Sequence, residues 1–83
     1  MSLAELHNKL QELEIPENTY YLNGIYGSPD DNDKIALAIR KGKFFVEYEV
    51  YFKEKGEKQS TKTFVTEDDA CQYIYRQLSS GAS

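Results

Sequence analysis

The stretch that decides the fold is Phe44-Phe45-Val46-Glu47-Tyr48-Glu49-Val50-Tyr51-Phe52. Successive side chains of a β-strand point to opposite faces, so this stretch divides into two sets. One set is wholly apolar or aromatic and is predicted to face the core: Phe44, Val46, Tyr48, Val50 and Phe52. The other set alternates aromatic rings with carboxylates: Phe45, Glu47, Glu49 and Tyr51. The stretch therefore predicts a strand with one buried face and one mixed face.

The mixed face has two interpretations. Aromatic and charged side chains form favourable cross-strand pairs on a solvated sheet face. Aromatic anchors beside charges are also common where one protein binds another. The sequence leaves both open.

Length and composition limit the kind of protein. The chain has 83 residues, of which 40% are hydrophobic and 13% aromatic, so one folded domain with a small core is expected. No apolar run approaches the roughly 20 residues that span a bilayer, and the first residues lack a signal-peptide pattern. A single cysteine, Cys71, excludes an internal disulfide and a cysteine-based zinc site, which suits a reducing cytoplasm. Residues 79–83 are predicted to be a disordered tail after a domain of residues 1–78.

The net charge of −4 is unevenly distributed. Residues 1–34 carry seven acids and two lysines, whereas residues 40–62 carry seven bases and four acids. A chain this acidic is a poor candidate for direct nucleic-acid binding, which depends on neutralising phosphates. A basic protein partner fits better, because opposite charges steer association.

Two helices are signalled at the ends of the domain. Ser2 and Glu5 have the spacing of a capping box, and Pro16 ends a helix expected over about residues 2–14. Its apolar stripe is Leu3, Leu6, Leu10 and Leu13. Thr66 is a suitable N-cap for the second helix, whose first turn is acidic. The core-facing stripe of that helix is Ala70, Cys71, Ile74, Tyr75 and Leu78.

Strand and turn signals fill the middle of the chain. Residues 20–22 form a possible short strand that ends at Asn23-Gly24, and residues 35–39 form another. Lys41-Gly42 is placed at the hairpin turn, with glycine supplying a positive φ. A further strand covers residues 60–65, with either Phe64 or Val65 facing the core.

The loop of residues 27–33 contains three acids, Asp30, Asp31 and Asp33. It lacks the ligand spacing, central glycine and distal glutamate of an EF-hand, so a solvated loop is favoured over a metal site. Its other interpretation is an acidic finger directed at a basic partner.

These elements predict an α+β fold in the order α-β-β-β-α. Both helices are expected on one face of an antiparallel, three- to four-stranded sheet, in two layers. Double-stranded RNA-binding domains share this order, but they place basic residues where this chain has Glu67-Asp68-Asp69.

No catalytic or cofactor-binding constellation stands out. His7 is the only histidine, and Cys71 reads as a small buried hydrophobe. Glu47 and Glu49 share a strand face but lack a pocket that would separate their pKa values. We therefore expect no enzyme activity, no metal and no cofactor.

Several short segments carry a resemblance to a known family. They are Ile15-Pro16, residues 20–24, residues 48–56, Thr63-Phe64 and residues 67–73 with Ala70-Cys71. These segments resemble small immunity proteins of bacterial polymorphic-toxin systems of the contact-dependent inhibition type. Such proteins bind and neutralise a toxin domain, often a nuclease, made by the same cell.

The resulting hypothesis is a cytoplasmic, non-catalytic inhibitor that covers the basic active site of a toxin domain. The expected partner-binding residues are Phe45, Glu47, Glu49 and Tyr51, flanked by Asp30, Asp31 and Asp33. The alternatives are an acidic adaptor or nucleic-acid-mimicking regulator of another basic protein, and a structural subunit that dimerises through its open face. No membrane association is expected, and the chain is expected to be a monomer or weak homodimer.

Overall fold

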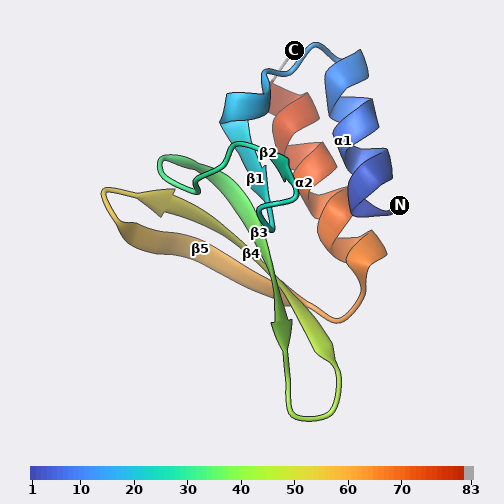
Figure 1. The fold of residues 1–83 in the computed structure, drawn as a ribbon, viewed down its shortest axis with the longest axis vertical. Helices are drawn as coiled ribbons and strands as arrows, with labels where there is room; N and C mark the ends of the chain where they lie inside the picture. The colour runs from blue at the N-terminus through green and yellow to red at the C-terminus, as the bar shows by residue number, and fades with distance from the viewer. Residues whose placement is uncertain (82–83) are drawn as a thin grey trace.

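The computed structural model describes residues 1–81 and confirms the α+β class (Figure 1). The helices are α1 (Leu3–Glu12) and α2 (Glu67–Gly81), and a short 3-10 helix, η1 (Glu17–Thr19), follows α1. The strands are β1 (Tyr20–Leu22), β2 (Tyr26–Gly27), β3 (Lys34–Lys41), β4 (Val46–Glu54) and β5 (Glu57–Phe64). The possible short strand at residues 20–22 is therefore present.

The sheet has five strands in the order β2-β1-β3-β4-β5 and is mixed, not antiparallel with three or four strands as expected. β1 runs parallel to β3, with Leu22 opposite Leu37, and the other neighbours are antiparallel. The difference arises at Asn23 and Gly24, whose positive φ angles of 53° and 74° fold β2 back against β1. The chain then returns through residues 28–33 to begin β3 beside the start of β1.

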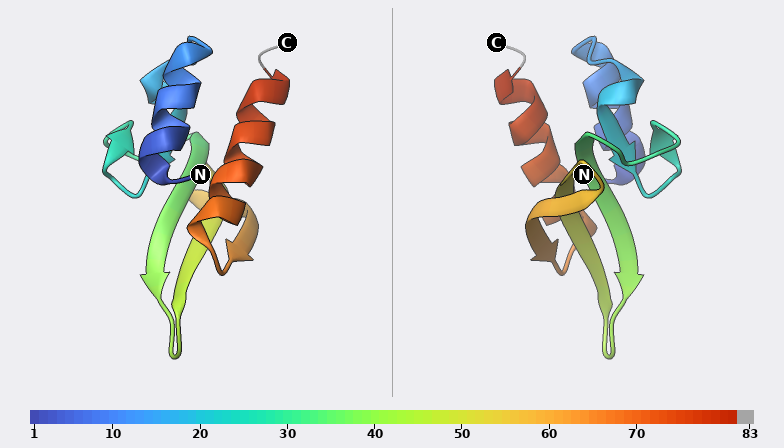
Figure 2. Two further views of the ribbon diagram at one scale, coloured as in Figure 1. Left: turned by 90° about the vertical axis from the view of Figure 1, so that its right-hand side faces the viewer. Right: turned by 90° about the vertical axis from the view of Figure 1, so that its left-hand side faces the viewer.

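Both helices pack on one face of the sheet, as predicted (Figures 1 and 2). Ser2 Oγ accepts from the Glu5 amide at 3.2 Å, and Thr66 Oγ1 accepts from the Asp69 amide at 3.1 Å, so both predicted N-caps form. The core joins both helices to three strands. Its buried residues are Leu3, Leu6, Leu10, Tyr20, Leu22, Leu37, Val50, Ala70, Cys71 and Ile74. Leu13 follows the end of α1 and is 41% exposed, so it does not extend the leucine stripe.

The predicted core face of the aromatic strand is only partly correct. Val50 is 1% exposed and Tyr48 packs against the core, but Val46 and Phe52 are exposed. Phe44 is the most exposed of these side chains, because β4 begins only at Val46 and the helices cover its middle. Phe64, not Val65, packs against the core.

The C-terminal boundary differs from the expected one. A disordered tail was predicted for residues 79–83, but α2 continues through Gly81, and residues 82–83 lie outside the described part of the chain. Across residues 1–81, neither helix has the length and apolarity that crossing a bilayer demands.

Candidate binding surfaces

The sheet face opposite the helices, termed the back face, was expected to be open. The β3–β4 register places Arg40 beside Glu47 and Ala36 beside Tyr51 on this face. Glu49 is only 7% exposed and Tyr51 only 4% exposed, so the expectation of an open face is wrong at these two positions.

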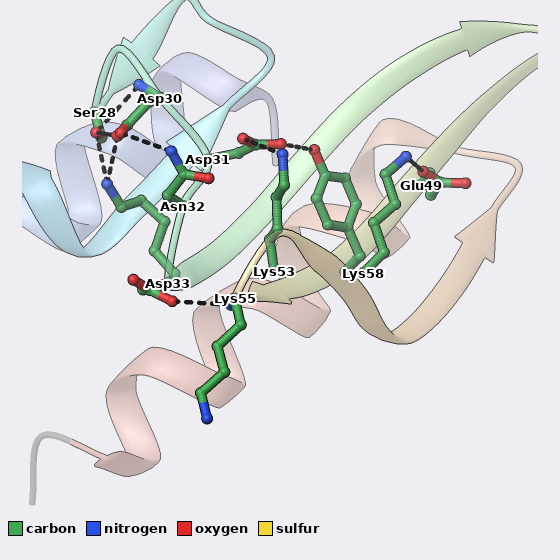
Figure 3. Close-up of polar contacts among 11 residues, drawn as sticks. Ser28, Asp30, Asp31, Asn32, Asp33, Glu49, Lys53, Lys55 and Lys58 are labelled. Atoms are coloured by element: carbon green, nitrogen blue, oxygen red, sulfur yellow. Dashed lines mark hydrogen bonds and ion pairs between the residues drawn. The ribbon is translucent and has the colours of Figure 1, made fainter.

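The acidic loop covers this part of the back face (Figure 3). The Tyr51 hydroxyl donates to Asp31 Oδ2 at 2.7 Å, and Lys53 Nζ donates to Asp31 Oδ1 at 3.3 Å. The hydroxyl bond and the lysine lower the pKa of the Asp31 carboxyl. Burial, together with the Asp31 carboxylate, raises the pKa of Tyr51. The structure thus brings the predicted loop and face together, with the loop packed onto the face instead of extending into solvent.

Glu49 is paired from both neighbouring strands. Arg40 Nη1 on β3 lies 2.8 Å from one carboxylate oxygen, and Lys58 Nζ on β5 lies 2.9 Å from the other. These contacts, with the one from Lys58 the strongest, lower the pKa of Glu49. Lys58 Nζ also lies 4.6 Å from the centroid of the Tyr51 ring. This arrangement matches the cross-strand-pair interpretation of the mixed face.

The other two loop acids also have partners nearby. Asp30 accepts from Lys34 Nζ at 2.7 Å and from the Ser28 hydroxyl at 2.8 Å. These bonds lower the pKa of Asp30 to about 2. Asp33 Oδ1 accepts a long bond of 3.4 Å from the Lys55 amide. The charges of Asp30, Asp31 and Glu49 are therefore compensated within the molecule.

A different surface is exposed at the end of the β3–β4 hairpin. We define the hairpin tip as residues Gly42–Val46, which connect β3 to the first residue of β4. The Gly42 amide donates to the Phe45 carbonyl at 2.9 Å, so Lys43 and Phe44 form the two-residue turn between them. The views in Figures 1 and 2 show this hairpin extending away from the helices. β5 does not support it, because the last β4–β5 pair is Tyr48 with Phe64.

Gly42 has a different role from the predicted one. Positive φ angles occur at Gly24, Gly27 and Gly56 but not at Gly42. A Cβ atom at Gly42 would lie 2.6 Å from the Phe45 carbonyl oxygen, which is a severe overlap. Glycine is needed here for close approach of the two strands, and the turn lies two residues later than expected.

The hairpin tip combines apolar and positive groups. Phe44 is 84% exposed, Phe45 56% and Val46 41%. Lys43 Nζ lies 5.4 Å from the centroid of the Phe44 ring. Of the predicted binding residues, Phe45 belongs to the tip and Glu47, which is half-buried, adjoins it. Phe44 was missed because the strand alternation was extended through the turn. The polar segment Lys41-Gly42-Lys43 is the signal that places Phe44 at the apex instead.

The remaining reactive side chains lie in packed surroundings. His7 Nδ1 is 3.0 Å from the Tyr20 hydroxyl and its ring stacks on Tyr26 at 4.9 Å, so His7 is not the solvent-facing residue that its helix position suggested. Cys71 is fully buried, and burial raises the pKa of its thiol to about 12. No three metal-ligating side chains gather into a possible metal site within residues 1–81.

Comparison of the chain with models of protein families, with curated proteins and with solved structures finds no match. The surfaces described above and the short motifs of the sequence are the features that bear on function.

Proposed function

We propose that this chain is a non-catalytic inhibitor, an immunity protein that binds and neutralises a cognate toxin domain in the cytoplasm. The short motifs that resemble immunity proteins supply the class of partner. The hairpin tip supplies the means of binding.

The observation that carries the proposal is the exposure of three consecutive apolar side chains, Phe44, Phe45 and Val46. They lie on a hairpin anchored in a five-stranded sheet, so they are presented without the ordering cost of a free loop. Aromatic residues of this kind dominate the binding energy of protein interfaces. Isolated exposed apolar residues are ordinary, but a run of three at the end of a projecting hairpin favours a binding role.

The predicted binding residues divide into two groups on this view. Phe45 and Glu47 lie at the hairpin tip or beside it and remain candidates for direct contact. The second group stabilises the back face. Tyr51 and Asp31 contact each other, and Glu49 pairs with Arg40 and Lys58. Asp30 and Asp33 are assigned to the loop that covers this face.

A second candidate function is an acidic adaptor or nucleic-acid-mimicking regulator of a basic protein. The helical segments, residues 1–19 and 67–81, carry seven carboxylates against two lysine or arginine side chains. Residues 20–66 carry eight cations against seven carboxylates, so the net negative charge resides on the helical side. This candidate would use the helices, whereas the immunity function proposed above uses the hairpin tip.

Co-expression tests the proposed function. A candidate toxin domain taken from a gene adjacent to that of this chain is expressed in a bacterial host with and without this chain, and growth is scored. Protection from growth arrest, together with co-purification of the two proteins, is expected. Growth arrest that persists when the chain is present and folded would refute the immunity function.

A further inference from the structure

We infer that the hairpin tip inserts into a cleft of the partner that has an apolar floor and carries carboxylates. The site that the tip blocks is therefore acidic and not basic. This inference rests on the proposed function for the identity of the partner as a toxin domain. It reverses the charge of the surface expected from the sequence.

The turn of the hairpin presents an exposed aromatic side chain at its end. Lys43 and Phe44 form a two-residue turn, which makes the end of the hairpin narrow. Phe44, the most exposed of the large apolar side chains described, stands at its apex. A narrow projection with an aromatic apex fits a concave partner surface, and the neighbouring Phe45 and Val46 extend the contact along one strand.

The charge of the tip decides the chemistry of that surface. Residues 40–47 contain three cations, Arg40, Lys41 and Lys43, and one carboxylate, Glu47. Arg40 already contacts Glu49, whereas Lys41 and Lys43 have no carboxylate within 4.0 Å among the described residues. Lys43 lies over the Phe44 ring, so a positive charge enters any cleft that receives the apex. Partner carboxylates would satisfy these lysines on desolvation, whereas partner cations would repel them.

The location of the negative charge agrees with this orientation. The excess of carboxylates lies on the helical segments. The hairpin extends in the opposite direction, away from the helices (Figure 2). An acidic cleft therefore attracts the tip and repels the helical side, which orients the chain with its tip toward the partner. An anionic lipid surface shares this attraction, and the experiment below separates the two.

Binding measurements on tip variants test the inference, with the purified toxin domain of the co-expression assay as the probe. Phe44→Ala is expected to weaken binding about 30-fold, the size that marks an interface hot spot. Lys43→Glu is expected to weaken it about tenfold or more, with a larger effect at low salt. Ile25→Ala and Lys55→Glu are the matched controls, because Ile25 and Lys55 are exposed on other turns, and they should bind as the unsubstituted chain does.

The possible outcomes separate the inference from the function on which it rests. If the unsubstituted chain binds and protects while both tip variants bind equally well, the tip is not the binding surface and the inference is wrong, whereas the immunity function stands and uses another surface. Tighter binding by Lys43→Glu would show a basic receiving site and overturn the inference. The tip variants are also tested on vesicles of phosphatidylcholine and phosphatidylserine. If the tip substitutions weaken binding to these vesicles but not to the toxin domain, the inference is wrong and the partner of the tip is a lipid surface. If the unsubstituted chain neither binds nor protects, the immunity function and the inference fail together.

Discussion

Tyr51 ties the acidic loop to the back face through its hydroxyl, which donates to Asp31 at 2.7 Å. Tyr51→Phe removes this bond to a charged group, so the free energy of unfolding is expected to fall by about 1.5–3 kcal/mol. The pKa of Asp31 should rise, because the hydroxyl is the largest cause of its lowered value. Urea unfolding and a carboxyl NMR titration would measure the two effects.

Tyr21→Phe is the matched control for this change. Tyr21 lies opposite Ala36 in the register, on the same face as Tyr51, and its hydroxyl has no hydrogen-bond partner among the described residues. If Tyr21→Phe and Tyr51→Phe destabilise the fold equally, the Tyr51–Asp31 bond contributes nothing specific.

The alternation of the sequence assigned Val50 and Phe44 to the same face of the strand, but the two side chains have different surroundings. Val50→Ala removes methyl groups from a side chain that is 1% exposed, and a loss of about 2 kcal/mol in unfolding free energy is expected. Phe44→Ala removes a ring that is 84% exposed, so its effect should stay within about 0.5 kcal/mol. Chemical denaturation of both variants gives the comparison. A large loss for Phe44→Ala would place this ring in the core, as the uninterrupted alternation implies.

Cys71 should resist thiol reagents in the native state. Its side chain is fully buried between the helices and the sheet, and burial raises its pKa to about 12, so the reactive thiolate is scarce at pH 8. Labelling by a disulfide reagent is expected to be slow in buffer and rapid in denaturant. Equal rates in the two solutions would contradict the packing of α2.

The β3–β4 hairpin depends on the absence of a side chain at Gly42. In Gly42→Ala, the new Cβ would lie 2.6 Å from the Phe45 carbonyl oxygen, so the backbone of the turn must shift. The expected loss of unfolding free energy is about 1–3 kcal/mol, typical of an overpacked site. Gly56→Ala is a useful comparison, because Gly56 has open space around it but a φ of 81°. For Gly42→Ala, changes in NMR chemical shift are expected only in residues 40–47, in agreement with a local steric origin. For Gly56→Ala, the changes should be confined to the turn that contains Gly56.

The two helices were predictable because their signals are local. Ser2 and Thr66 lie next to the turns that they cap, and the buried leucines repeat within a single helix. The mixed sheet was not predictable, because the parallel pairing of β1 with β3 depends on how β2 and the following loop return the chain. Strand parity also failed toward both ends of the aromatic stretch, at Phe44, Val46 and Phe52, since alternation says nothing about where neighbouring elements stop covering a strand.

The candidate site was predictable only in part, for the same physical reason. Phe45 is exposed at the end of the hairpin, as the alternation predicted for this side chain, and Glu47 is half-buried beside it. Asp31 and Tyr51 are 20 residues apart, and the contact between them arises from the path of the loop across the sheet. The charges of Arg40 and Lys58 were visible in the sequence, but their positions on either side of Glu49 follow from strand register.

The whole molecule is expected to lose stability in acid because of its paired carboxylates. Asp30 has a pKa of about 2, and the pKa values of Asp31 and Glu49 are also lowered from ordinary values of 3.8 and 4.5. The unfolded chain therefore binds more protons than the folded chain as the pH falls below about 5. The stabilisation is complete at neutral pH, above the unfolded pKa values, and is lost as the pH falls through the lower folded ones.

Glu49→Gln tests this assignment most directly. At pH 7 the variant leaves Arg40 and Lys58 without their shared carboxylate, and a loss of about 1.5–3 kcal/mol in unfolding free energy is expected. Because the variant lacks one carboxyl group whose pKa is lowered by folding, its unfolding free energy should decline less between pH 5 and pH 2. Glu12→Gln, at an exposed position without an ion pair in the described structure, should retain the full decline. Urea unfolding of the three proteins at several pH values distinguishes them, and parallel pH profiles for all three would show that Glu49 is not responsible for the acid sensitivity.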